Sequence, residues 1–183
     1  MEIQKPTLVN QGLKFGLIMG FIQIAVTLLL YIIDKNLLVD FKIIFVLLLL
    51  AIVLMVLPVR AYKKQNNGSI LFSEAFYICL IAIAGGTLLG NVFSYFLYNI
   101  IDPTLPEFIK EQTIEKTVAF MERMGTPQED IEKGIAPLLE QDFNMTPAKL
   151  GGMFFQSVLF GAIPALIIAA IMRTRVKPLD DIQ

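Results

Sequence analysis

The sequence predicts an all-α integral membrane protein with four transmembrane helices and an amphipathic helical hairpin between the third and the fourth. Hydrophobic residues make up 56% of the 183 residues and charged residues only 17%, whereas a soluble domain carries about 25% charged residues. The mean hydropathy is +0.68. The apolar residues are gathered in four long uncharged runs. Lipid is therefore the solvent that we expect around most of the chain.

Each of the four runs is long enough to cross a bilayer, which takes about 20 apolar residues. Backbone amides in lipid must be paired within their own segment, so each run should be a helix. The first run is expected to be retained, because it is longer than a signal-peptide core of about 7–15 residues. One compact bundle fits the length, so we expect a single domain over residues 1–183. The expected spans are residues 15–33, 43–59, 75–101 and 150–172.

The distribution of lysine and arginine predicts that both termini face the cytoplasm, because basic residues are enriched on that side of a membrane. With four spans, the N-terminal segment, the loop after the second span and the C-terminal tail share one side. The segment 102–149 then lies on the other side, outside the cytoplasm. The eight basic residues on the cytoplasmic side are Lys5, Lys14, Arg60, Lys63, Lys64, Arg173, Arg175 and Lys177.

Several classes of chemistry are excluded by composition. The chain has no histidine, and its one cysteine, Cys79, lies in an apolar run. Disulfides within the chain, Cys/His metal sites and histidine-activated nucleophiles are therefore ruled out. The sequence has no GxSxG, no HExxH and no glycine-rich phosphate loop. The net charge of −1 argues against a nucleic-acid partner. We expect no enzyme and no cofactor.

Residues 62–76, "YKKQNNGSILFSEAF", form the most polar run in the first hundred residues. They are either a functional site or the turn between two spans. Asn67 and Gly68 are turn formers. Ser73 is expected to cap the third helix, with Glu74 near its positive end. The turn is the favoured interpretation.

This run, a third span that ends in "YNIIDP" and the acidic segment after it resemble a bacterial membrane family, domain of unknown function 4199. The segment "MERMGTPQEDIE" resembles the family's outer helical pair, and the similarity covers nearly the whole chain. The resemblance implies an inner-membrane protein with four spans, and it brings no activity, ligand or catalytic residues. The matching positions are Tyr62, Lys63, Lys64, Gly68, Phe72, Ala75, Asp102 and Pro103.

Small residues recur on one face of the first span, and GxxxG and proline occur in later spans. The small residues let helix backbones approach closely, and the proline is expected to kink the fourth span. Gln23, Asn91 and Gln156 either line a pore or form hydrogen bonds between helices. Carriers driven by protons or ions usually place an ionisable group inside the membrane, and these runs contain none, so packing is favoured. The candidate packing residues are Gly12, Gly16, Gly20, Gln23, Gly86, Gly90, Asn91, Gln156, Gly161 and Pro164.

The segment 102–149 holds ten acidic and five basic residues. Its first helix should end at Gly125, a typical position for glycine. The second should begin at Thr126 as N-cap, with Glu129 completing a capping box. Pro137 is expected to interrupt it. The apolar stripes of the two helices should face each other or the bilayer.

Glu107, Glu111 and Glu115 recur at every fourth position and form the candidate outer acidic surface. Such a row either binds divalent cations weakly or is a solvated helix face. Lys110 and Lys116 lie nearby, which favours the solvated face, and no metal site is assigned.

Three classes of function are open to such a chain. An enzyme that acts on lipid is disfavoured because catalytic groups are missing. A small oligomeric transporter or channel is the alternative. It is disfavoured because the spans carry no charge and because four spans enclose little volume, so that a pore would need several copies. The favoured hypothesis is a structural, interaction or accessory protein. Its partners would be the lipid bilayer and either a protein bound through the hairpin or a second copy of the chain.

Overall fold

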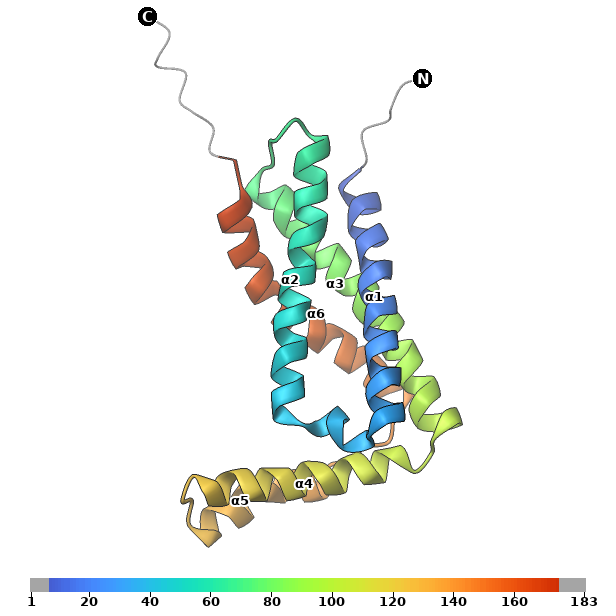
Figure 1. Cartoon of the computed structure of the whole chain (residues 1–183), viewed down its shortest axis with the longest axis vertical. Helices are drawn as coiled ribbons and strands as arrows, with labels where there is room; N and C mark the ends of the chain where they lie inside the picture. Colours follow the sequence, from blue (N-terminus) through green and yellow to red (C-terminus); the bar gives the residue numbers. More distant parts are fainter. Residues whose placement is uncertain (1–6, 175–183) are drawn as a thin grey trace, which may run out of the picture. The chain divides into compact units, whose positions relative to one another are not determined.

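The computed structural model describes residues 7–174, and no strand occurs in that range. The basic residues Lys5, Arg175 and Lys177 lie outside the described residues. The helices can be followed in Figure 1. In chain order they are α1 (Leu8–Ile33), the 3₁₀ helix η1 (Lys35–Val39), α2 (Phe41–Gln65), α3 (Phe72–Phe96), the π-helix η2 (Leu97–Ile101), α4 (Leu105–Arg123), α5 (Gln128–Glu140) and α6 (Pro147–Met172).

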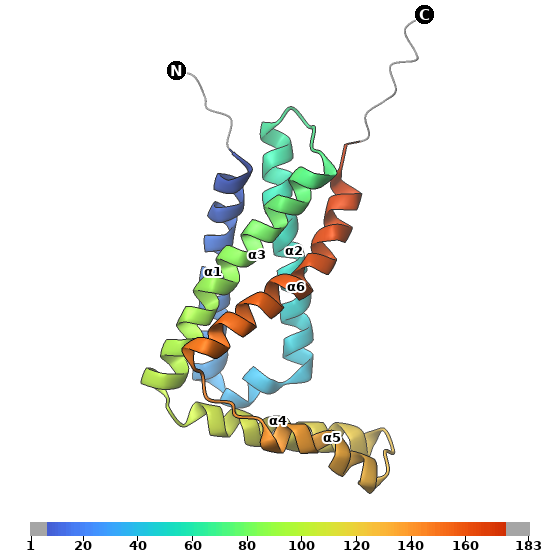
Figure 2. The ribbon, with the colours of Figure 1, turned by 180° about the vertical axis from the view of Figure 1, so that it is seen from behind.

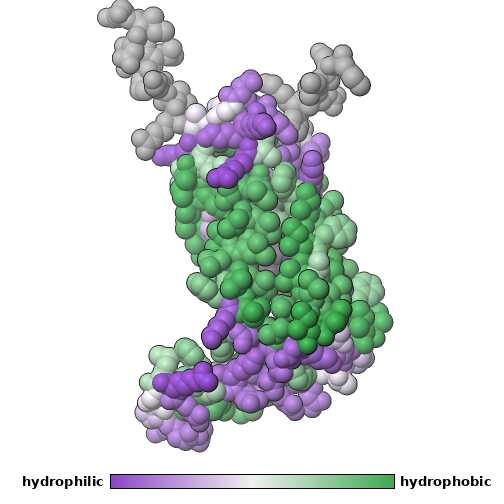
Figure 3. All heavy atoms as spheres, in the orientation of Figure 1, coloured by the Kyte–Doolittle hydropathy of each residue, from purple (hydrophilic) through white to green (hydrophobic). Residues whose placement is uncertain are grey.

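Four of these helices are long and apolar enough to cross a membrane: α1, α2, α3 with η2, and α6. The predicted all-α membrane fold with four spans is confirmed. Each of the four long helices begins two to seven residues before the predicted span, because the residues that precede the uncharged run also form helical hydrogen bonds. Figure 3 shows hydrophobic side chains over the long helices, and hydrophilic ones at the α2–α3 loop and over α4 and α5.

The contacts divide the described residues into two compact units. The first holds residues 7–22, Leu50–Leu89 and residues 154–174. The second holds Gln23–Leu49 and Gly90–Met153. The single domain over residues 1–183 stays a prediction.

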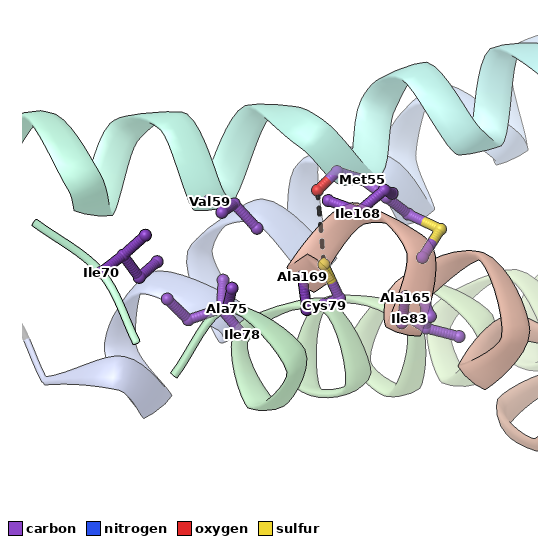
Figure 4. Close-up of a cluster of buried hydrophobic side chains, with 10 residues drawn as sticks. All are labelled: Met55, Val59, Ile70, Ala75, Ile78, Cys79, Ile83, Ala165, Ile168 and Ala169. Carbon is purple, nitrogen blue, oxygen red and sulfur yellow. Dashed lines mark hydrogen bonds between the residues drawn. The ribbon is translucent and has the colours of Figure 1, made fainter. Parts of the chain in front are cut away.

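The core of the first unit is formed by α2, α3 and α6 (Figure 4). Its side chains are small or branched, so the helices approach closely, as is usual inside membranes. The Cys79 thiol donates to the carbonyl of Met55, 3.7 Å away. The thiol is therefore a buried packing group. The core residues are Met55, Val59, Ile70, Ala75, Ile78, Cys79, Ile83, Ala165, Ile168 and Ala169.

The core of the second unit lies where η1, η2 and α4 meet. Val39, Leu97, Leu105 and Ile109 are buried there. Partly buried aromatic rings surround them, including Tyr31 at the end of α1. This cluster fixes the start of α4 against the connection between α1 and α2.

The predicted cap at the start of α3 was wrong. The helix begins at Phe72, so Ser73 lies inside its first turn. Instead, the carboxylate of Glu74 accepts from the N–H of Leu71 at 2.8 Å. Glu74 therefore satisfies a free amide at the positive end of the helix, where a negative charge is favoured.

Two predictions about α5 were also wrong. Pro127 has a ψ of 148°, so it is not helical and itself occupies the N-cap in place of Thr126. Pro137 does not interrupt the helix, which continues to Glu140. The proline ring removes only one bond near the C-terminus, and the N–H of Gln141 still reaches the carbonyl of Pro137 at 3.1 Å.

Candidate functional site

The candidate site is the hairpin formed by α4 and α5, which lie side by side (Figures 1 and 2). Gly125 turns the chain with a φ of +75°, a conformation that glycine adopts without strain. Its N–H donates to Glu122 at 2.9 Å, and the N–H of Thr126 donates to Met121 at 3.1 Å. This pattern satisfies the last carbonyls of α4. The predicted glycine end of the first helix is confirmed.

Two contacts hold the helices of the hairpin together. A Cβ at Gly134 would lie 3.0 Å from the end of the Met121 side chain, so glycine makes room for this methionine. Near the other end of the pair, the ammonium group of Lys110 donates to the carbonyl of Leu139 at 2.6 Å. The hairpin is therefore an ordered surface and not a loose loop.

Asp102 connects the end of η2 to the end of α1 and to η1. Only 8% of its surface is exposed. Its carboxylate accepts from the Lys35 ammonium at 2.5 Å and from the Tyr31 hydroxyl at 3.1 Å. It also accepts from the Thr104 hydroxyl at 2.6 Å. The Lys35 ammonium further lies 5.2 Å from the centre of the Tyr31 ring. We call these four residues the Asp102 anchor.

The Asp102 anchor is charged at neutral pH. The hydrogen bond from Lys35, followed by the one from Thr104, lowers the pKa of Asp102 to about 2. The same hydrogen bond from Lys35 to Asp102 raises the pKa of Lys35. Charge-assisted hydrogen bonds of this kind are stronger than neutral ones. The anchor therefore fixes the start of α4 to η1 through an ion pair and to the end of α1 through the hydrogen bond from Tyr31.

One face of α4 lies against η1 and the start of α2. The Lys116 ammonium donates to the carbonyl of Asn36 at 2.7 Å. The ring of Phe120 lies 5.9 Å from the ring of Phe41. Ile109, on the same face, is buried in the core of this unit. We call this side of α4 the docked face.

Glu107, Glu111 and Glu115 are all exposed. Each glutamate is followed nine residues later by a residue on or near the docked face. The pairs are Glu107 and Lys116, Glu111 and Phe120, and Glu115 and Met124. Nine residues make about two and a half turns of an α-helix, which places them on opposite sides. The predicted acidic row therefore points away from η1. We call it the acidic face.

A shallow open cleft lies beside the start of α4 and is lined by Glu107 and Lys110 among others. Asp142, also in the lining, pairs with Lys149 at 2.5 Å, and that hydrogen bond lowers the pKa of Asp142. No three Asp, Glu, Cys or His residues in the described part of the chain are placed to hold a metal ion.

The glycines of α1 lie against α3 in the first unit. A Cβ at Gly16 would lie 2.9 Å from the carbonyl oxygen of Ala82 and 3.2 Å from the Cα of Gly85. A Cβ at Gly12 would lie 2.7 Å from the Ile81 side chain, and a Cβ at Gly20 would lie 2.9 Å from the Leu89 side chain. The α1 and α3 backbones are therefore close enough that only glycine fits.

The other candidate packing residues are divided between the two units. In the first, a Cβ added at Gly86 would lie 3.3 Å from the Gly16 carbonyl oxygen, and one added at Gly161 would lie 2.9 Å from the Ile83 side chain. Pro164 is partly buried inside α6, and Gln156 is exposed on that helix.

In the second unit the Gln23 amide lies over Gly90, where a Cβ would be 2.6 Å from it. The Asn91 Nδ2 atom is buried and has no hydrogen-bond partner among the described residues. Gln23 and Asn91 therefore differ in their surroundings. The Gln23 amide fills the space above a glycine, whereas the Asn91 Nδ2 atom has no hydrogen-bond partner in the described part of the chain.

A protein-family model described as "Protein of unknown function (DUF4199)" matches residues 14–174. The chain belongs to this family. No curated protein and no solved structure matches the chain.

The matched range includes the run 62–76, whose residues attach the α2–α3 turn to the end of α6. The Lys63 ammonium donates to the carbonyl of Met172 at 2.9 Å, which satisfies one of the last carbonyls of that helix. The hydroxyl of Thr174 donates to the carbonyl of Gly68 at 3.3 Å and accepts from the N–H of Ile70 at 3.0 Å. The run is therefore a turn with a defined structural role.

Sequence reasoning assigned no role to Lys35 or Thr174, and it reached Asp102 only through the family resemblance. Lys35 and Asp102 are 67 positions apart, and Lys63 and Met172 are 109 apart. No periodic pattern relates residues at such separations. The available signals were Lys35, two residues after the first span, and Asp102, directly after the third.

Proposed function

We propose that this DUF4199 protein is a non-enzymatic, multi-pass protein of the bacterial inner membrane that acts by contact with a protein partner. The observation that carries the proposal is the acidic face, formed by Glu107, Glu111 and Glu115 on an ordered hairpin. Complementary charge speeds the approach of a partner and orients it. The partner would therefore present a basic surface.

The geometry of the hairpin supports this role. The docked face and the Asp102 anchor hold α4 in place, and the acidic face lies on the opposite side, where a partner can reach it. A surface that is ordered before binding loses less conformational entropy when the complex forms.

The orientation we propose places both termini in the cytoplasm and the hairpin outside it. Alkaline phosphatase, which is active only outside the cytoplasm, should be active when fused after Gly125 and inactive when fused after Gly68. The reason is the excess of basic residues near the α2–α3 turn. The opposite pattern of activity would overturn the orientation.

Replacing Glu107, Glu111 and Glu115 together by lysine should abolish recovery of the crosslinked partner, because like charges then face each other. Insertion and thermal stability should not change, since all three side chains are exposed. The matched control reverses the same number of exposed charges on α5, at Asp130, Glu132 and Glu140, and should leave recovery intact. Equal loss in both triple variants, or in neither, would contradict the proposed surface.

The alternative function is that of a small oligomeric transporter or channel. The observation that favours it is the Nδ2 atom of Asn91 on α3, which is buried and has no hydrogen-bond partner within residues 7–174. Flux of ions and small metabolites into proteoliposomes distinguishes the two functions. Saturable transport that disappears in the Gln23→Leu or Gln156→Leu variant would replace the contact proposal with the transport one.

A further inference from the structure

An apolar surface of the second unit begins on α2 and continues onto α4. Exposed side chains recur on α2 at the spacing of one helix face, at Phe41, Ile44, Phe45 and Leu48. This helix is long and apolar enough to cross a membrane, so the stripe is suited to lipid. The ring of Phe41 contacts the ring of Phe120, which is itself 53% exposed. The surface that suits lipid on α2 therefore extends onto α4.

Within the second unit, α4 contacts the ends of three spans. Leu105 and Ile109 pack with Leu97 at the end of the third span, and Tyr31 of α1 lies against the same cluster. Phe120 packs on Phe41, the first residue of α2. A helix that contacts the ends of several spans crosses them and does not extend them.

The charges of α4 are divided between its two sides. Lys116 and Arg123 are seven residues apart and share a face, and Phe120 lies between them on that face. Met124, 69% exposed, follows Phe120 by four residues. The glutamates are on the opposite side. An apolar stripe flanked by Lys and Arg, with acidic groups turned away, is the pattern of a helix that lies in a bilayer interface.

We propose that α4 lies in the plane of the lipid–water interface. Phe120 and Met124 enter the boundary between headgroups and acyl chains of phospholipid, and Arg123 lies at the level of the phosphate groups. The contact function described above does not require this position. The proposal adds a lipid-bound side to α4, opposite the acidic face.

The absence of tryptophan allows a direct test in the full chain. Phe120→Trp, reconstituted in vesicles of phosphatidylcholine and phosphatidylglycerol, should show blue-shifted emission and lose most of its fluorescence to brominated phosphatidylcholine. Aqueous iodide should quench it little. Glu111→Trp, on the opposite side of the same helix, should show the reverse pattern.

Met124→Trp is a second probe of the same face, and it keeps the test valid if the Phe120 variant does not fold. Quenching of both probes by iodide, as for Glu111→Trp, would overturn the proposal. Protection of both from iodide and from brominated lipid would also overturn it, because protein would then cover the face. Neither outcome depends on whether the acidic face binds a partner.

Discussion

Replacing Gly16 with leucine lowers the thermal midpoint of the protein in detergent, by an amount that corresponds to about 1–3 kcal/mol. A Cβ at this position would lie 2.9 Å from the Ala82 carbonyl oxygen and 3.2 Å from the Gly85 Cα. Both are backbone atoms of α3, so they cannot move away as the end of a side chain can. The two helices must separate, and their close packing is lost.

Gly152→Leu on α6 is the matched control, because a Cβ at Gly152 meets no atom within 4 Å. Both variants gain up to about 1 kcal/mol of helix propensity, so the difference between them reports the steric contact alone. The control should melt at or slightly above the wild-type temperature. Equal midpoints for Gly16→Leu and Gly152→Leu would show that α1 and α3 do not depend on this contact.

Replacing Asp102 with asparagine is expected to destabilise the protein by about 1–3 kcal/mol, because the part-buried groups that donate to this buried carboxylate lose a charged partner. Asp142→Asn is the comparison. Asp142 also pairs with a lysine, but its side chain is 56% exposed, and water and salt screen exposed pairs so that they contribute little to stability. Thermal midpoints of the two variants in detergent measure the difference. A loss in Asp142→Asn as large as that in Asp102→Asn would contradict the role of burial.

The contribution of Asp102 should depend on pH in a defined direction. Its pKa is lowered from 3.8 to about 2 in the folded protein, so its stabilisation is complete above about pH 4 and is lost as the pH falls through about 2. The pKa of Lys35 is raised from 10.5. The stabilisation that Lys35 contributes is therefore complete below about pH 10.5 and is lost as the pH rises through the raised pKa. The difference in midpoint between the wild type and Asp102→Asn should therefore be constant near neutrality and shrink toward pH 2.

The sequence alone determined the fold class and most of the helices. Uncharged runs of this length can be stable in lipid only as helices, so the four spans follow from composition. The hairpin was predicted because Gly125 ends one helix and apolar residues recur beyond it. The spacing of Gly12, Gly16 and Gly20 placed three small residues on one face. The run 62–76, together with Asp102 and Pro103, carries the resemblance to the family.

Only the tertiary structure decided which segments meet. It paired Lys35 with Asp102, Lys63 with the end of α6, and Phe41 with Phe120. The helical repeat shows that Glu111 and Phe120 lie on opposite sides of α4, but it does not show which side is docked. Helical periodicity arises from hydrogen bonds between residues a few positions apart, and it describes one helix at a time. Contacts between distant segments depend instead on how the helices pack in space.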